Sequence, residues 1–320
     1  MPKKTFFHKI LHGKSPLLII LILVVLVITV IDKPGSLTAG NAQAIMAQLC
    51  YFCIFGVGVG MLLMGGGFDF ATSAHATMST LIFLKFMQWF PQLPWPIYIL
   101  AALCFGAFAG GFNAYLAHGL GLMPFIATIG MKSVWGGLAS WATRGNYVSI
   151  NIPAFSKFSS ARIGDTPIPW LFIGVIAIVI IYGVILKWTR FGRSVLMVGG
   201  NAYASRLAGL NPNKVKSLLY VNNGVLAAVG GLIWSSQQKM YNPAGLTTLM
   251  PEMTALTAAI LGGVSFMGGS GSLGGAFFGI MLITTLSYSL QVMALPLWFV
   301  TITSLNPASF NSASASRTPG

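Results

Sequence analysis

The feature that most constrains this chain is a succession of long apolar runs separated by short polar segments. Each run is about 15 to 24 residues long, and a helix needs about 20 to cross the hydrocarbon core of a bilayer. We place the runs near residues 16–31, 43–64, 70–90, 96–118, 124–142, 168–188, 217–236, 253–268 and 273–292. The sequence therefore predicts an all-α, polytopic transmembrane helical bundle with about 9 to 10 spans.

The scarcity of charge supports the same conclusion. Charged residues make up 7% of the 320 residues, against about 25% in a typical soluble domain. A formal net charge of +14 would suit nucleic-acid binding, but the basic residues lie between the apolar runs and not on a polar domain. This distribution is typical of membrane orientation. We therefore exclude nucleic acid as a partner and expect a lipid bilayer.

The basic residues also predict which ends face the cytoplasm. If the basic N-terminus, residues 1–15, is cytoplasmic, six crossings return the chain to that side before residues 187–216. The predicted inner segments then hold ten Lys/Arg, and the predicted outer loops hold five together with three of the four acids. This bias satisfies the positive-inside rule.

Glycines spaced along the apolar runs indicate close helix packing. Helices in lipid gain little from hydrophobic attraction to one another, so small residues that let backbones approach become important. Gly56 and Gly60, Gly106 and Gly110, and the glycines of residues 268–279 have this character.

The inner loop, residues 189–216, contains its own helix signals. Asn201 is a favoured N-cap, Gly209 suits the left-handed position just past a helix end, and Pro212 prevents continuation. These signals predict a helix of about two turns, roughly 202–208, outside the membrane. Such a helix could dock another protein or rest on anionic lipid, and the residues alone favour neither interpretation.

A second unusual segment is residues 64–73, Met-Gly-Gly-Gly-Phe-Asp-Phe-Ala-Thr-Ser. Its three glycines break the helix, and irregular backbone at membrane depth is tolerated only where it lines protein or a water-filled cavity. Asp69 is therefore a functional candidate. It could accept hydrogen bonds from the hydroxyls of a polar solute, or it could cap the following helix through the amides of Thr72 and Ser73.

The sequence offers no catalytic constellation. The histidines lack metal-ligand spacing, the Cys50–Cys53 pair lies in an apolar run without a redox-fold context, and a P-loop motif is absent. We predict no enzyme activity, no metal and no cofactor in this chain. A nucleotide site of the P-loop type is therefore not expected on this chain.

Several stretches together resemble the permeases of bacterial ribose/xylose/galactose-type ABC importers. The similarity covers about residues 45–292. The stretches are GGFD (66–69), PFIATIG (124–130), RFG (190–192), GGN (199–201), SRLAGL (205–210), EMTALTAAILGG (252–263) and GGVSFMGGSGSLGGAFFG (262–279). The sequence departs from the family pattern at Thr254, where Asp is usual, and at residues 70–73, where Leu-Ser-Val-Gly is usual.

The resemblance implies a permease of the bacterial cytoplasmic membrane that works with ABC ATPase subunits, an extracytoplasmic sugar-binding protein and a second permease copy or paralogue. It implies that the helix after Asn201 is the coupling helix. The coupling residues would be Gly199, Gly200, Asn201, Arg206, Leu207 and Gly209. The candidate residues of the solute pathway are Phe68, Asp69, Phe70, Lys132 and Glu252.

The expected organisation is a cytoplasmic N-terminus at 1–15, a permease domain at 16–292 and an atypical tail at 293–320. The family generally ends with a further apolar helix, so we expect the tail to reflect a truncated reading frame or a natural short form. The alternatives are a branched-chain amino-acid permease, which would favour paired charges in the pathway, and an ion-coupled secondary transporter, which would favour two matching halves.

Overall fold

The computed structural model describes residues 14–36, 38–150, 152, 155, 157, 159, 161–164 and 166–293. Residues 1–13 and 294–320 lie outside this part, so the structure does not address most of the predicted N-terminal segment or of the predicted tail. Nearly all of the regular secondary structure in the described part is helical, as the apolar runs predict. A helix coincides with each of the nine predicted segments.

The first half of the described chain forms α2 (Lys14–Asp32), α3 (Ala39–Met64), α4 (Thr72–Trp89), α5 (Trp95–Ala114) with a π-helical turn η1 (Tyr115–Gly119), and α6 (Pro124–Thr143). The second half forms α8 (Trp170–Trp188), α9 (Arg190–Gly200), α10 (Ala202–Leu207), α11 (Pro212–Gln238), α12 (Gly245–Leu249), α13 (Pro251–Leu261) and α14 (Leu273–Val292). Two short strands, β1 (Val148–Ser149) and β2 (Met240–Tyr241), pair antiparallel with Val148 opposite Tyr241.

Five of these helices are long and apolar enough to cross a membrane by themselves: α3, α5 with η1, α8, α11 and α14. The apolar parts of α2 and of α12–α13 are shorter. Helix α4 is more polar because it carries a run of hydroxyl residues and His75, and these side chains are buried inside the bundle. The polar side chains of α4 therefore face other helices of the protein and not lipid.

The predicted eighth segment, residues 253–268, is wrong in its extent. Helix α13 ends at Leu261, and a loop of residues 262–272 follows. Eleven helical residues extend about 16 Å, roughly half of the hydrocarbon core. The helix stops because glycines dominate the next residues, and Gly263, Gly268, Gly269 and Gly271 all adopt positive φ, which helix geometry does not allow.

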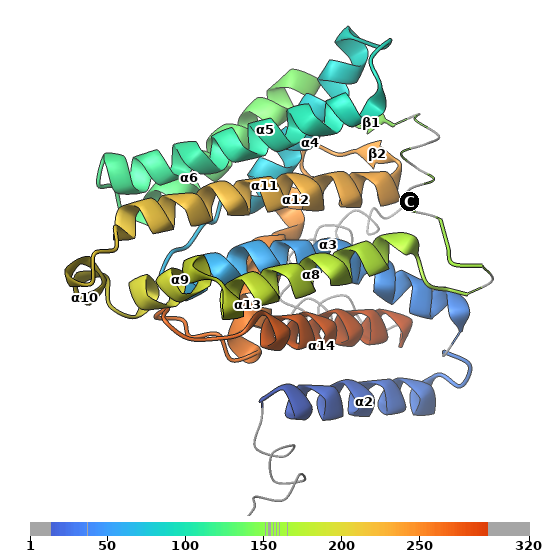
Figure 1. Ribbon diagram of the computed structural model, residues 1–320. Coiled ribbons are helices and arrows are strands. Elements are labelled where there is room, and N and C mark those ends of the chain that lie inside the picture. Colours follow the sequence, from blue (N-terminus) through green and yellow to red (C-terminus); the bar gives the residue numbers. More distant parts are fainter. Residues whose placement is uncertain are drawn as a thin grey trace, which may run out of the picture.

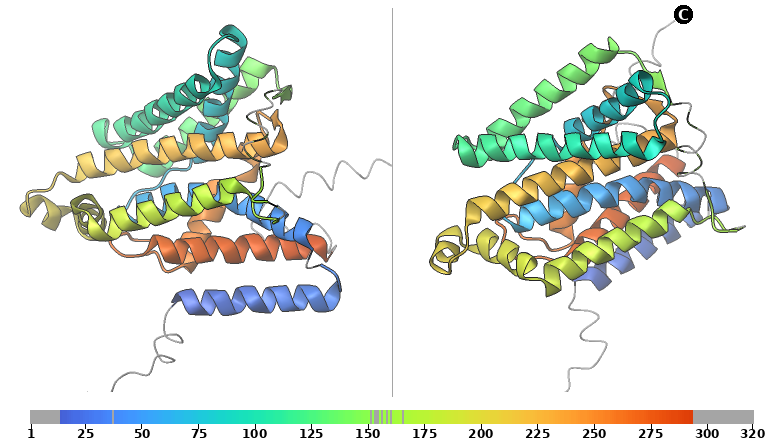
Figure 2. Two further views of the ribbon diagram at one scale, coloured as in Figure 1. Left: turned by 45° about the vertical axis from the view of Figure 1, so that its right-hand side comes forward. Right: turned by 45° about the horizontal axis from the view of Figure 1, so that its top comes forward.

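The long helices run roughly parallel to one another (Figure 1), with α9 and α10 at one end of the bundle and β1 and β2 at the other. Helix α11 is central and packs against α5, α3 and α4. Helix α2 lies at the margin (Figure 2, left) and packs mainly against α14. Large apolar side chains on α2, α6 and α8 point outward, as expected of surfaces that face lipid.

The predicted role of glycine in helix packing is confirmed at several crossings. A Cβ atom built on Gly106 would clash with the backbone of Gly224, and one on Gly110 would clash with the carbonyl oxygen of Tyr220. Helices α5 and α11 therefore meet backbone to backbone. In the same way, Gly279 in α14 leaves no room for a side chain beside Ala258 in α13.

Candidate functional site

The helix predicted near residues 202–208 is present as α10, Ala202–Leu207. The Asn201 side chain accepts a hydrogen bond of 2.9 Å from the Ala204 amide, which is the geometry of an N-cap. Gly209 follows the helix with φ +82°. The Leu210 amide then donates to the Ser205 carbonyl at 3.0 Å, which closes the helix end. The local signals in the sequence are confirmed.

Helix α10 protrudes from one end of the bundle (Figure 1) and leaves most of its side chains exposed. Tyr203 is 72% exposed and Leu207 is 75% exposed, one helical turn apart, with Arg206 exposed beside them. Ser205 is buried and faces the bundle. The predicted residues Arg206 and Leu207 are therefore on the exposed face of α10, opposite the buried Ser205. Sequence reasoning missed Tyr203, although its spacing of four residues from Leu207 was a usable signal.

The predicted coupling loop contains a second helix that the sequence analysis did not resolve. Helix α9, Arg190–Gly200, begins with Thr189 as N-cap, whose hydroxyl accepts a hydrogen bond of 3.1 Å from the Gly192 amide. Its Val195 and Val198 side chains are buried. Gly199 and Gly200 are thus the last turn of α9, directly before the N-cap of α10.

Asp69 lies in the break between α3 and α4 and is the centre of a buried polar cluster. One carboxylate oxygen accepts hydrogen bonds from the Ala71 amide at 2.9 Å and from Asn113 Nδ2 at 3.0 Å. The other accepts from Asn223 Nδ2 at 3.1 Å and lies 3.7 Å from Nδ1 of His75. The cluster links the break to α4, α5 and α11.

These contacts contradict the capping role expected for Asp69. The amide that donates to the carboxylate belongs to Ala71, and α4 begins without a side-chain cap. The Asp69 side chain is buried, and the residue lines a small pocket together with Phe68, Phe70 and Glu252, so its role in the solute pathway stays a prediction. Sequence reasoning missed Asn113 and Asn223. Both are amides inside otherwise apolar runs, which is the signal that marks them.

Lys132 and Glu252 form an ion pair between α6 and α13, with Nζ and Oε1 2.7 Å apart. Glu252 is buried, and its Oε1 also accepts a hydrogen bond of 3.0 Å from the Ser73 hydroxyl on α4. Lys132 keeps 18% of its side chain exposed. The pair therefore neutralises two charges inside the helical bundle, while the lysine side chain keeps contact with an accessible surface.

An aromatic row lies near these groups, and Phe68, Phe70 and Glu252 line the same small pocket. The rings of Phe68 and Phe266 are 5.1 Å apart, and those of Phe70 and Phe125 are 5.2 Å apart. Phe68 and Phe70 are half-buried, whereas Phe125 and Phe266 are exposed. The row thus joins the break after α3, the start of α6 and the loop after α13. Of the five predicted pathway residues, the structure brings Phe68, Phe70, Lys132 and Glu252 to or near this surface.

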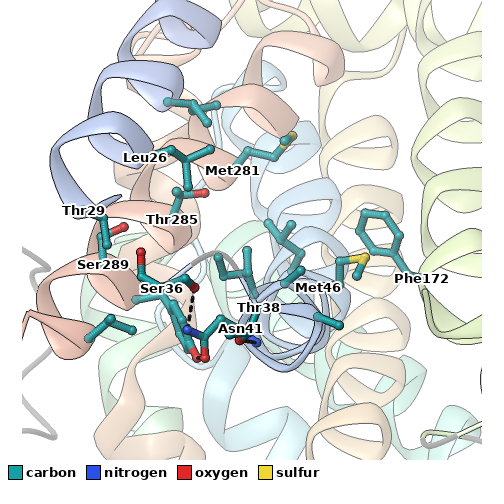
Figure 3. Close-up of a pocket in the computed structure, with 17 residues that line it drawn as sticks. Leu26, Thr29, Ser36, Thr38, Asn41, Met46, Phe172, Met281, Thr285 and Ser289 are labelled. Carbon is teal, nitrogen blue, oxygen red and sulfur yellow. Dashed lines mark hydrogen bonds between the residues drawn. The ribbon is translucent and has the colours of Figure 1, made fainter. Parts of the chain in front are cut away.

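A separate cavity of about 490 Å³ lies at the other end of the bundle, where α2, α3 and α14 meet (Figure 3). Its polar wall includes Asn41, which donates to the Ser36 carbonyl at 2.7 Å and accepts from the Tyr288 hydroxyl at 2.8 Å. Its remaining wall is mostly apolar, with Leu26, Met281 and others. None of the predicted site residues lines it. Within the described residues, no three His, Cys, Asp or Glu side chains gather as a metal site would require.

Comparison with known proteins gives consistent matches over most of the chain. The family described as branched-chain amino acid transport system / permease component matches residues 41–305. The chain is 29% identical over 281 residues to the autoinducer 2 import system permease protein of Klebsiella pneumoniae, a match that covers 87% of this chain and 79% of that protein.

Two further relatives show similar coverage. The chain is 28% identical over 296 residues to the galactose/methyl galactoside import permease protein of Haemophilus influenzae, covering 88% of this chain and 87% of that protein. It is 26% identical over 301 residues to the ribose import permease protein of Escherichia coli K12, covering 93% and 91%. No solved structure matches this chain significantly.

Proposed function

We infer the function of this chain from the premise that it belongs to the family of permease components that matches residues 41–305. It is the membrane-spanning permease subunit of an ATP-driven importer, and it moves a sugar or a similar small polar solute by alternating access. The chain carries out no chemistry on the solute. ATP binding and hydrolysis take place on separate ATPase subunits, and their motion re-orients the helices around a central pathway.

Support for a sugar-like solute comes from the relatives. The family description mentions branched-chain amino acids, whereas the relatives described above are named for autoinducer 2, galactose and ribose. The ion pair between Lys132 and Glu252 is the kind of paired charge that the amino-acid alternative would favour, so the support for a sugar comes from the relatives. A sugar needs hydrogen-bonding groups and aromatic faces, and half-buried rings are present at Phe68 and Phe70.

The proposed mechanism depends on docking of the ATPase against this chain. Helix α10 is short, capped at both ends and exposed, with an apolar and basic face formed by Tyr203, Arg206 and Leu207. A connector between two membrane helices needs no such helix. We assign this face to the ATPase, which places α9, α10 and the N-terminus in the cytoplasm. The opposite end, with β1 and β2, then receives an extracytoplasmic sugar-binding protein.

The solute pathway in this proposal runs along the side of the bundle that carries the aromatic row, Lys132 and Glu252. In this proposal a second permease copy or paralogue lies against this side and closes the pathway, where the exposed rings of Phe125 and Phe266 and the partly exposed Lys132 are found. Asp69 acts from inside the bundle by holding the break after α3 in position.

The test is uptake by cells that lack their own monosaccharide and leucine importers and express this chain with its ATPase and solute-binding protein. Radiolabelled ribose, galactose and leucine serve as probes. We expect uptake of at least one sugar, loss of uptake when the catalytic glutamate of the ATPase is replaced by Gln, and no effect of a protonophore while ATP is maintained. Uptake of leucine alone would favour the amino-acid alternative. Uptake that survives the inactive ATPase and collapses with the protonophore would indicate an ion-coupled transporter.

A further inference from the structure

Three glycine-rich segments that are far apart in the sequence meet at one point beside α10. They are the break after α3, the last turn of α9 and the loop after α13. A Cβ atom built on Gly199 would clash with the Met64 carbonyl oxygen and lie 2.7 Å from the Gly269 amide nitrogen. One built on Gly268 would lie 2.9 Å from the Cα atom of Gly66 and 2.9 Å from the Gly199 carbonyl oxygen. We call Gly66, Gly199, Gly268 and Gly269 the glycine junction.

The glycine junction is stabilised by hydrogen bonds in addition to close packing. The Gly269 amide donates to the Met64 carbonyl at 2.8 Å, which ties the loop after α13 to the end of α3. Lys216, in the second turn of α11, donates from Nζ to the Gly66 carbonyl at 3.2 Å. Backbone therefore rests on backbone without intervening side chains. Closely packed groups of this kind transmit a displacement because they have little room to absorb it.

The position of the junction connects α10 with the aromatic row. Gly199 and Gly200 end α9, and Asn201, the next residue, caps α10. On the other side, Gly66 lies two residues before Phe68, and Gly268 lies two residues after Phe266. The ring centroids of Phe68 and Phe266 lie 5.1 Å apart, so the two loops are also in contact through these side chains. One contact with the last turn of α9 thus reaches both loops that carry aromatic side chains of the row.

We propose that the glycine junction passes the movement of α10 to the two loops and so opens and closes the inner end of the solute pathway at Phe68 and Phe266. This inference rests on the proposed function, since it requires the ATPase to move α10. It assigns Gly199 and its partners as positioning residues that act through the loops and do not touch the solute.

The test uses the complete importer in proteoliposomes, with the ATPase, the binding protein and the sugar identified by uptake. Gly199→Ala inserts a methyl group where only backbone fits. We expect the complex to assemble and hydrolyse ATP, but to transport about ten-fold less sugar per ATP. Gly274→Ala is the matched control. Gly274 lies in the first turn of α14, next to the same loop, and a Cβ atom there meets nothing within 4 Å. It should transport as the unmodified chain does.

A second variant keeps the proposal falsifiable if Gly199→Ala fails to assemble. Lys216→Met leaves every glycine in place and removes the ammonium group with its hydrogen bond to Gly66, so we expect assembly with a several-fold lower ratio of sugar to ATP. An unchanged ratio in an assembled Gly199→Ala complex, or in Lys216→Met if the first does not assemble, would overturn the junction. ATP-driven uptake by the unmodified chain would still uphold the proposed function, and its absence would overturn that function separately.

Discussion

At the scale of single residues, the chain places a carboxylate at membrane depth and surrounds it with donors. Ionisable side chains inside a bilayer are costly unless they are paired or hydrogen-bonded. Asp69 receives hydrogen bonds from Ala71, Asn113 and Asn223. Because these donors belong to different parts of the bundle, the carboxylate holds the break after α3 against two other helices.

Asp69→Asn should therefore lower stability and leave solute affinity unchanged. Asn has one acceptor oxygen where Asp has two, so its NH2 group would face N–H donors that now donate to a carboxylate oxygen. A hydrogen bond to a charged group contributes about 1.5–3 kcal/mol. We expect a lower melting temperature in detergent and less folded protein, with an unaltered KM for sugar uptake by the protein that folds. Asp32→Asn, at the exposed end of α2, is the control and should change neither. A raised KM at an unchanged melting temperature would instead put Asp69 in contact with the solute.

The importance of Asp69 could be predicted from the sequence, but its role could not. It stands out as an acid next to three glycines in an apolar chain. Its partners Asn113 and Asn223, however, are 44 and 154 residues away. Which side chains meet across such separations depends on how the helices pack, and hydropathy does not specify that packing. The same holds for the pairing of Lys132 with Glu252, 120 residues apart.

At the scale of elements, the accuracy of each predicted helix depended on how local its sequence signals are. Helix α10 was predicted to within a residue because Asn201 and Gly209 act on their own neighbours. Helix α9 was missed because residues 189–200 were treated as part of the inner loop, whereas burial of Val195 and Val198 stabilises a helix there. Helix α13 was predicted too long because residues 262–268 are apolar enough to extend the run.

The end of α10 gives a prediction at this scale. Gly209 has φ +82° and open space around it, so the backbone conformation alone restricts the side chain. Gly209→Val should distort the helix end, because β-branched residues are strained at positive φ. We expect it to lower the stimulation of ATP hydrolysis by loaded binding protein at least several-fold. Gly209→Asn should keep most of it, since Asn tolerates the left-handed region. Equal stimulation in both variants would contradict a docking role for this geometry.

At the scale of the whole molecule, the apolar runs and the basic loops predicted a helical membrane bundle and the position of each long helix. They did not predict that α13 stops short or that its following loop returns to contact α9 and the end of α3. Those contacts depend on glycines that let two backbone segments approach closely, such as Gly199 beside Met64. The sequence showed that the glycines were numerous but not where each of them would pack.

The central claim is that α10 lies in the cytoplasm, where an ATPase can move it, and labelling with an impermeant maleimide tests this most directly. In a Cys104→Ser background, which leaves only the buried Cys50 and Cys53, Tyr203→Cys places a thiol on α10. Tyr147→Cys places one at the opposite end, where Tyr147 is 67% exposed. We predict that Tyr203→Cys reacts in inverted membrane vesicles and not in spheroplasts, and that Tyr147→Cys does the reverse. Labelling of Tyr203→Cys in intact spheroplasts would contradict the account.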